Sequence, residues 1–218
     1  PPEAVSIALD PLLTPQENAQ RYFKQYRKSR TAREYALSRR DALLAEIGYL
    51  EGQLDNIEKC GDARELAEIR DEMIALRYMK ADSGARKRQK SPPTKPMQFL
   101  APDGTRIYVG KNNRQNDELT LRKAAPENYF VHVKNSPGSH VIVDCAGEPS
   151  RETLYAACQL AAFYSKSRAS SNVPVDYTPR RFVKKPAGAR PGMVVYTTYH
   201  TAFITPDPAA IAGYMRID

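Results

Sequence analysis

Apolar residues in the first third of the chain follow the spacing of long helices. The segment Thr-Pro-Gln-Glu at 14–17 is a capping box with proline in the first helical position, so it predicts a helix from Pro15 to about Lys59. In the second half of this helix, apolar residues alternate in steps of four and three, the a/d spacing of a coiled coil. The residues of this seam are Leu43, Ile47, Leu50, Leu54 and Ile57. The pattern predicts a stripe that a partner helix covers.

A second, shorter helix follows Gly61. Asp62 and Glu65 form another capping box, and apolar steps of three and four continue along a helix over about 62–80. We expect the two helices to fold back on each other as an antiparallel hairpin, a coiled-coil arm over residues 1–80.

The two predicted helices differ in length. The return helix covers less than half of the first one, and the chain starts with Pro1 and not with Met. We therefore interpret the sequence as part of a longer protein. In that protein a further helix packs against residues 15–40, unless two copies of the chain pair there.

The second half of the chain has the alternating pattern of short strands. Residues 81–96 form a basic linker with Pro-Pro in it, which marks a domain boundary. Residues 97–218 then contain one clear helix, from Ser150 to about Lys166, and strand-like segments joined by short turns. The predicted strands are 97–101, 106–110, 129–134, 140–144, 175–178, 181–185, 193–197 and 201–205. The fold class is therefore α+β, with a mostly antiparallel sheet.

Charge is divided unevenly along the chain. The net charge is +8, and residues 81–218 hold 20 Lys/Arg against 11 Asp/Glu. This excess indicates a polyanionic partner, nucleic acid first, with a merely basic surface as the alternative. Within the arm, residues 21–40 carry eight basic residues and one acidic residue, whereas residues 41–72 carry ten acidic and three basic residues. We expect the acidic end to avoid phosphate and to favour a basic protein surface.

Cysteine usage and hydropathy narrow the class of protein. The three cysteines, Cys60, Cys145 and Cys158, form no CxxC pair and no disulfide framework, which favours a reducing compartment. No apolar run approaches the ~18 residues of a membrane span, and nothing resembles a signal peptide. We therefore expect a cytoplasmic protein.

The first candidate site is the polar run VGKNNRQNDELT, residues 109–120. Amides and cations that follow a strand suit contacts with phosphate, sugar or base. Caps and turns that bond their own backbone explain the same residues equally well. The run is not a P-loop, because the glycine spacing and the GK[ST] ending are missing. The candidate contacts are Lys111, Asn112, Asn113, Arg114, Asn116 and Asp117.

The second candidate is VHVKNSPGSHVIV, residues 131–143, which holds two of the three histidines. With residues 135–139 as a hairpin loop, His132 and His140 share one face as diagonal neighbours, roughly 7 Å apart. A register shift of one residue would put them on opposite faces.

Three roles compete for this histidine pair. A metal site would need a third ligand from His200, Asp144 or Cys145, and no ligand spacing is present. Acid–base catalysis needs a nucleophile or a carboxylate pair, and the sequence marks neither. Hydrogen bonding within the fold, or contact with RNA, remains. In the RNA reading, Gly138 takes a positive φ and Ser139 binds a phosphate oxygen, so the candidates are His132, Gly138, Ser139 and His140.

The third candidate is VDYTPRRFVKKPAGARPG, residues 175–192, where cations alternate with aromatic residues. This composition suits an RNA backbone with unstacked bases, and a charged edge strand is the alternative. The candidate contacts are Arg180, Arg181, Lys184 and Lys185, near Arg190, Tyr177 and Phe182. The linker cations Arg86, Lys87, Arg88 and Lys90 add to the same positive field.

Long segments of the chain resemble the NFACT family. LDPLLTPQENAQRYFKQYRKSR, EIGYLE and ELAEIRDEM are similar to its coiled-coil region. VGKNNRQNDELT, FVHVKNSPGSHVIV, AACQLAAFYS, VDYTPRRFVKKPAGARPGMVVY and TAFITPDP resemble its C-terminal NFACT-R domain. The resemblance covers nearly the whole chain in the family's order.

The resemblance implies a role in ribosome-associated quality control. Family members bind a large ribosomal subunit obstructed by peptidyl-tRNA, recruit tRNA, and promote untemplated C-terminal tailing of the stalled chain, with alanine in bacteria. The implied partners are rRNA, a stalk-base protein reached by the coiled coil, and tRNA, which is engaged mainly by N-terminal domains that this sequence lacks. Because the ribosome supplies the peptide-bond chemistry, we expect no catalytic residue, metal or cofactor here.

Two other functions stay open from the sequence. An older name for bacterial members proposes a surface adhesin that binds fibronectin. A ribonuclease that uses His132 and His140 is the third hypothesis.

Overall fold

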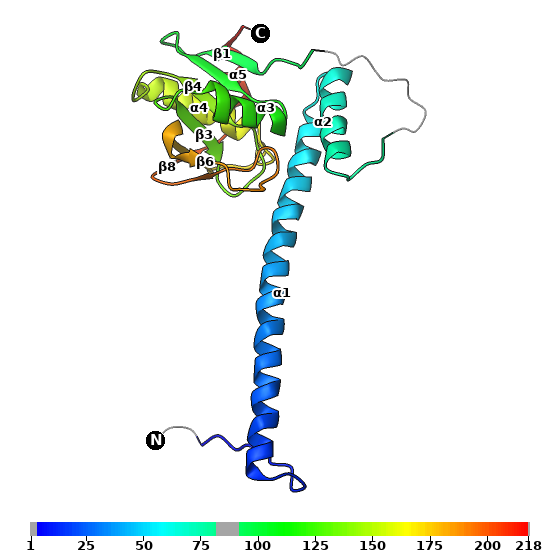
Figure 1. The fold of residues 1–218 in the computed structure, drawn as a ribbon. Coiled ribbons are helices and arrows are strands. Elements are labelled where there is room, and N and C mark those ends of the chain that lie inside the picture. The colour runs from blue at the N-terminus through cyan, green and yellow to red at the C-terminus, as the bar shows by residue number, and fades with distance from the viewer. Residues whose placement is uncertain (1–3, 82–91, 218) are drawn as a thin grey trace. The chain divides into compact units, whose positions relative to one another are not determined.

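The computed structural model describes residues 4–81 and 92–217. Figure 1 shows the order of its helices and strands along the chain. Two compact units make up the chain, residues 1–47 and residues 48–218. The greater part of the predicted linker lies outside the described residues, as do its cations Arg86, Lys87, Arg88 and Lys90.

The first unit contains the start and most of the length of helix α1, Pro15–Glu58. The predicted capping box is present: the Thr14 N–H donates to the Glu17 carboxylate at 2.8 Å, and the Glu17 N–H donates to Thr14 Oγ1 at 3.3 Å. Asn18, 2% exposed, accepts from the Asp10 N–H at 2.8 Å and so ties the preceding turn to the helix. The side chains of residues 21–40 are all exposed.

Helix α2, Ala63–Ala75, meets the last turns of α1 through polar and aromatic groups (Figure 1). The Tyr49 hydroxyl donates to the Glu72 carboxylate at 2.7 Å, the Gln53 amide donates to it at 2.5 Å, and the Tyr49 and Tyr78 rings stack 5.8 Å apart. Most of the predicted heptad seam on α1 is exposed instead, namely Leu43, Ile47, Leu54 and Ile57. Heptad spacing identified an apolar stripe, but α2 packs on a different face of α1.

The second unit contains a seven-stranded antiparallel sheet in the order β8-β5-β3-β4-β2-β1-β9. The strands are β1 Met97–Leu100, β2 Arg106–Val109, β3 Tyr129–Val133, β4 Val141–Asp144, β5 Val173–Pro179, β8 His200–Ile204 and β9 Met215–Arg216. A separate two-stranded sheet pairs β6, Val183–Lys184, with β7, Val195–Tyr196. The α+β class and the mostly antiparallel sheet are confirmed.

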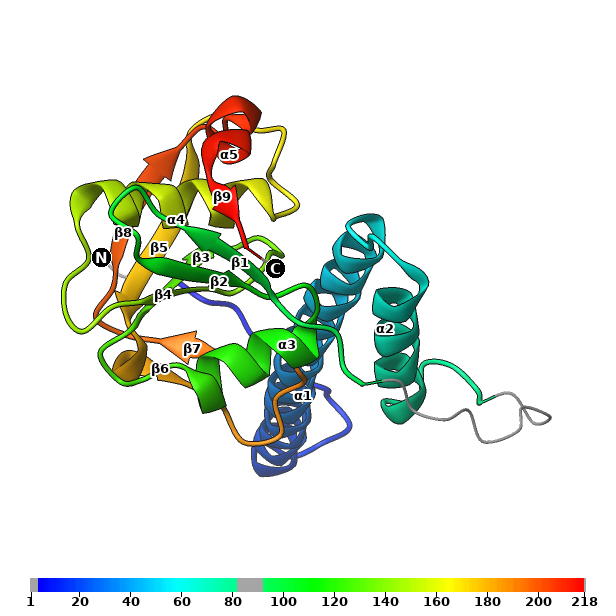
Figure 2. The same cartoon turned by 90° about the horizontal axis from the view of Figure 1, so that it is seen from above.

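Alternation along the strands builds a core on each face of the large sheet. Helix α4, Arg151–Phe163, covers one face, and its small residues Ala157 and Ala161 are fully buried against Val131 and Val133. On the opposite face Phe130 and Ile142 are buried in a second cluster with Leu119 and Val183. Figure 2 shows the β6–β7 pair on the side of the sheet away from α4. The chain therefore places the two candidate hairpin histidines on the face away from α4.

Short helices lie in segments that had no clear period. Helix α3, Asn113–Glu118, continues directly into the π-helix η1, Leu119–Lys123. The 3₁₀ turn η2, Arg180–Phe182, shortens the predicted strand at 181–185 to β6, and α5, Pro208–Gly213, precedes β9. Segments of three to six residues are too short for a helical period to show in the sequence.

Candidate nucleic-acid interface

The predicted polar run folds as helix α3 and contacts α2. Asn112 caps α3 by accepting from the Gln115 N–H at 3.0 Å, and its amide donates to the Glu68 carboxylate at 2.7 Å. Lys111 Nζ lies 2.7 Å from the carboxylate of Glu65, with both side chains largely buried. Capping and internal pairing, the alternative explanation of this run, account for the bonds of these two side chains, and their role as RNA contacts stays a prediction.

Asn116 and Asp117 are also used within the fold. Asn116, 2% exposed, accepts from the His140 N–H at 3.0 Å. A methyl group on Gly110 would lie 2.1 Å from Asn116 Oδ1, so this close approach requires glycine. The Asp117 carboxylate accepts from the Gly192 N–H at 3.0 Å. Both residues therefore position loops, and their contact with RNA stays a prediction.

The histidine pair lies between the sheet and its second cover. Phe130 pairs with Ile142, so His132 stands directly opposite His140, two residues away from the predicted register. The two rings are perpendicular, with centroids 5.4 Å apart. The shared face is confirmed, and the diagonal arrangement is wrong.

Both histidines are held neutral by their surroundings. His140 Nδ1 accepts from the Thr120 hydroxyl at 2.8 Å, and Nε2–H donates to the Gly192 carbonyl at 3.1 Å. Burial lowers the pKa of His140 to about 3 and that of His132 to about 4. Both ring nitrogens of His140 are bonded within the fold, and both imidazoles are neutral at pH 7, so the pair offers no positive charge to a phosphate.

The NSPGS loop is fastened to the end of α4. Asn135, with φ 53°, takes the left-handed conformation that we predicted for Gly138. Gly138 is needed for a different reason, because a methyl group there would lie 3.0 Å from Ser165 Cβ. Ser139 is 1% exposed, and its N–H donates to the Tyr164 carbonyl at 3.0 Å. The predicted role of Gly138 and Ser139 as a phosphate-binding loop is therefore not supported.

Two of the four cations predicted at 180–185 are structural. Arg180 donates to the carbonyls of Thr120 and Leu121, at 2.6 and 2.9 Å, in the π-helix. Lys185 Nζ pairs with the carboxylate of Asp117 and thereby joins β6 to α3. Their charges are used to hold secondary structure together.

Three other predicted cations face solvent. Arg181 and Lys184 are exposed on η2 and β6, and Arg114 is exposed on α3. The Arg181 guanidinium lies 5.1 Å from the Phe182 ring centroid, which orients it beside an aromatic face. We call Arg114, Arg181 and Lys184 the basic surface.

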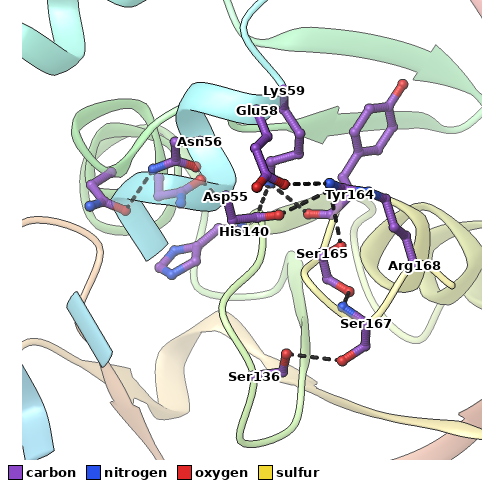
Figure 3. Close-up of polar contacts among 12 residues, drawn as sticks. Asp55, Asn56, Glu58, Lys59, Ser136, His140, Tyr164, Ser165, Ser167 and Arg168 are labelled. Atoms are coloured by element: carbon purple, nitrogen blue, oxygen red, sulfur yellow. Dashed lines mark hydrogen bonds and ion pairs between the residues drawn. The ribbon is translucent and has the colours of Figure 1, made fainter. Parts of the chain in front are cut away.

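The last turns of α1 contact the segment after α4 through a charge network (Figure 3). Lys59 Nζ lies 2.6 Å from the Asp55 carboxylate and donates to the Tyr164 carbonyl at 3.0 Å. Arg168 binds Asp55 at 3.0 Å and Glu58 at 2.8 Å. We expected a basic protein surface to bind the acidic end of the arm. For Asp55 and Glu58 that partner is Arg168, in the second half of the same chain.

An aromatic and cationic cluster extends this contact. The Arg190 guanidinium lies 5.1 Å from the Tyr49 ring centroid and 5.3 Å from that of Tyr78. Glu72 accepts from Tyr49 and, at 3.4 Å, from the amide of Asn113, and burial raises its pKa. The sequence analysis did not predict this cluster, because it assigned the packing face of α1 to the apolar heptad seam, and these polar residues lie beside that seam. Their signal was a polar face repeating at helical spacing.

The described residues contain neither a cluster of metal ligands nor a membrane-spanning helix. Among residues 4–81 and 92–217, no group of three or more His, Cys, Asp or Glu side chains is arranged to hold a metal ion. No helix in the same ranges is long and apolar enough to cross a membrane.

Comparison with known families assigns the chain to two regions of one family. Residues 2–92 match the NFACT N-terminal and middle domains, and residues 95–197 match the NFACT protein RNA binding domain. The chain belongs to the NFACT family. The basic surface therefore lies in the NFACT RNA-binding domain, and the contact between α2 and α3 joins two NFACT regions.

Named relatives support the same assignment. The chain is 38% identical to the Rqc2 homolog RqcH of Bacillus subtilis over 93% of its length, and 41% identical to that of Streptococcus pneumoniae serotype 2 over 98%. It spans only 35% and 38% of those proteins. A solved structure, the C-terminal part of the fibronectin/fibrinogen-binding protein from Streptococcus suis, is similar with a TM-score of 0.83 and 38% identity. That similarity covers 95% of this chain and 82% of the other.

Proposed function

We propose that this chain binds RNA through the basic surface of its NFACT RNA-binding domain. The observation that supports this is selective exposure: Arg114, Arg181 and Lys184 reach solvent, while Arg180 and Lys185 are bonded inside. The Lys185–Asp117 pair ties β6 to α3, so the three exposed cations stand on elements that are joined to each other. Fixed cations of this kind suit the phosphates of a folded RNA.

We infer that the full-length protein acts in ribosome-associated quality control. It would bind the obstructed large subunit and tRNA and support alanine tailing, with the ribosome supplying the chemistry. The names of the relatives support this role. The exposed residues 21–40, with eight cations and one acid, suit rRNA. Because much of the acidic end is paired internally, it supports contact with a stalk-base protein less well than the sequence suggested.

Charge reversal on the basic surface tests RNA binding. We expect the double variant Arg181→Glu/Lys184→Glu to weaken binding of a tRNA-sized RNA by at least tenfold at about 100 mM salt, because two phosphate contacts become repulsive. The slope of log affinity against log salt should become shallower by roughly 1.5. Fluorescence anisotropy across a salt series measures both quantities.

The matched control is Arg151→Glu, an exposed cation on α4, on the other side of the sheet. It should reduce affinity less than twofold. Equal effects of the two variants would mean that the net charge, and not this surface, attracts RNA. Absence of RNA binding by the unaltered chain at low salt would refute the proposal itself.

A second function is favoured by the name of the Streptococcus suis relative, which is called a fibronectin/fibrinogen-binding protein. We expect the full-length protein to co-sediment with large ribosomal subunits and to release them at high salt. A pull-down with immobilised fibronectin is the competing measurement. Binding to fibronectin without ribosome association would favour the adhesin.

A further inference from the structure

A second exposed cluster lies at the β8 edge of the sheet, on the face away from α4. Pairing aligns Lys134, Pro174 and Phe203 in one cross-strand row, since the Lys134 N–H donates to the Pro174 carbonyl at 2.8 Å and Pro174 pairs with Phe203. The next row on the same face, two residues along each strand, contains Asp176 and Thr201. Side chains at alternate positions of a strand share a face, so these rows form one surface.

Lys134 connects this surface to Tyr199. Its ammonium lies 4.7 Å from the Tyr199 ring centroid, and its side chain remains 33% exposed. Asp176 stands beneath it, 2% exposed, with a carboxylate oxygen 3.6 Å from Lys134 Nζ. The same carboxylate accepts from the Thr201 hydroxyl at 2.6 Å and from the Tyr196 hydroxyl at 2.9 Å. A buried, fully bonded carboxylate thus holds a cation at the surface beside an aromatic ring.

Two large aromatic side chains remain open to solvent on this surface. Phe203 is 64% exposed and Tyr199 is 42% exposed, and the Tyr199 ring is braced edge-on by Tyr196 at 5.4 Å. Tyr199 and Phe203 are four positions apart in the chain, which corresponds to about 13 Å along a strand. Lys134 reaches the space between them. This distance exceeds one nucleotide step of an extended backbone, so it suits two unstacked bases that flank one intervening nucleotide, with the backbone phosphates between them.

We propose that Lys134, Tyr199 and Phe203 form a stacking site for unpaired nucleotides of RNA. Two bases that flank one nucleotide stack on the two rings, and Lys134 contacts a backbone phosphate between them. Addition of a peptide strand to the β8 edge would use Phe203, but it would leave unexplained why a buried carboxylate holds Lys134 over Tyr199. Tyr199 and Phe203 lie beyond the residues matched to the RNA-binding family model, and the site is distinct from the basic surface. The proposal rests on RNA binding by this domain.

Single-stranded and double-stranded RNA separate this site from the basic surface. The probes are a labelled ten-nucleotide oligouridylate and a 16-base-pair RNA duplex, with affinity measured by fluorescence anisotropy. We expect Tyr199→Ala and Phe203→Ala each to weaken oligouridylate binding about fivefold or more, and to change duplex binding less than twofold. Tyr199→Phe keeps the ring and should keep the affinity. Tyr35→Ala, which removes an exposed aromatic side chain from α1, is the matched control.

The possible outcomes are distinct. If both alanine variants bind oligouridylate like the unaltered chain while Arg181→Glu/Lys184→Glu weakens binding, the stacking site is refuted and the proposed function stands. Equal loss for duplex and single strand also refutes stacking. If the unaltered chain binds neither RNA, the proposed function fails as well. Photocrosslinking of 4-thiouridine RNA to the unaltered chain is independent of variant folding, and crosslinks at residues 199–203 are expected.

Discussion

Lowering the pH from 7 to 5 is expected to reduce the free energy of unfolding of the second unit by about 4 kcal/mol. Burial lowers the pKa of His140 to about 3 and of His132 to about 4 from 6.5. Between pH 6.5 and these values the unfolded chain binds more protons than the folded chain, so stability falls as the pH falls. Each histidine contributes about 2 kcal/mol by pH 5, where the unfolded imidazole is almost fully protonated.

Urea unfolding followed by near-ultraviolet circular dichroism measures this effect, because the chain has 13 tyrosines and no tryptophan. The window above pH 5 is informative, since the carboxyl groups with a lowered pKa, such as Asp103 and Asp62, act mainly below it. The raised pKa of Glu72 opposes the histidine effect in this window, and it does so equally in every variant compared. His140→Gln should lower stability at pH 7 and flatten the pH dependence. His200→Gln, at an exposed histidine, is the matched control. A His140→Gln variant with the original slope would contradict the assignment.

Replacing Asp55 with alanine is expected to cost about 3–5 kcal/mol at the contact between α1 and the sheet domain. Asp55 is 3% exposed, and its carboxylate faces Lys59, which is 14% exposed, and Arg168. Burial already lowers the pKa of Lys59, so removal of the carboxylate leaves a poorly solvated cation. Hydrogen exchange of the last turns of α1 should accelerate by roughly two to three orders of magnitude, while β3 and β4 stay protected.

Two variants separate this buried pair from ordinary surface charge. Glu58, 65% exposed, also binds Arg168, and Glu58→Ala should cost less than about 1 kcal/mol. Asp55→Ala/Lys59→Met removes both charges and should recover part of the loss, because no unpaired buried ion remains. An Asp55→Ala variant with unchanged exchange would show that other contacts hold the helices in place.

Part of the candidate interface was readable from the sequence. The residue types at 180–185 and the charge excess indicated a polyanion, and the family assignment agrees with an RNA-binding domain. The sequence did not show which of these cations face solvent. Lys184 in β6 faces solvent, while Lys185, directly after that strand, is paired with Asp117 on α3, because neighbouring side chains of an extended segment point to opposite sides.

The sequence by itself determined the elements whose signal is local. A capping box started α1 at Pro15, and apolar alternation placed β3 and β4 with their histidines on one face. These features depend on neighbours a few residues apart, so they can be predicted from spacing and propensity.

Only the tertiary structure decided what the polar side chains do. Asp55 meets Arg168 across 113 residues of chain, and His140 meets Gly192 across 52. The same carboxylate or imidazole can bind a partner inside the protein or outside it, and nothing in its local sequence distinguishes the two. Burial and distance in the folded chain decide between the two. Most of the predicted contact residues bond within the domain, whereas Lys134, Tyr199 and Phe203 form an exposed surface.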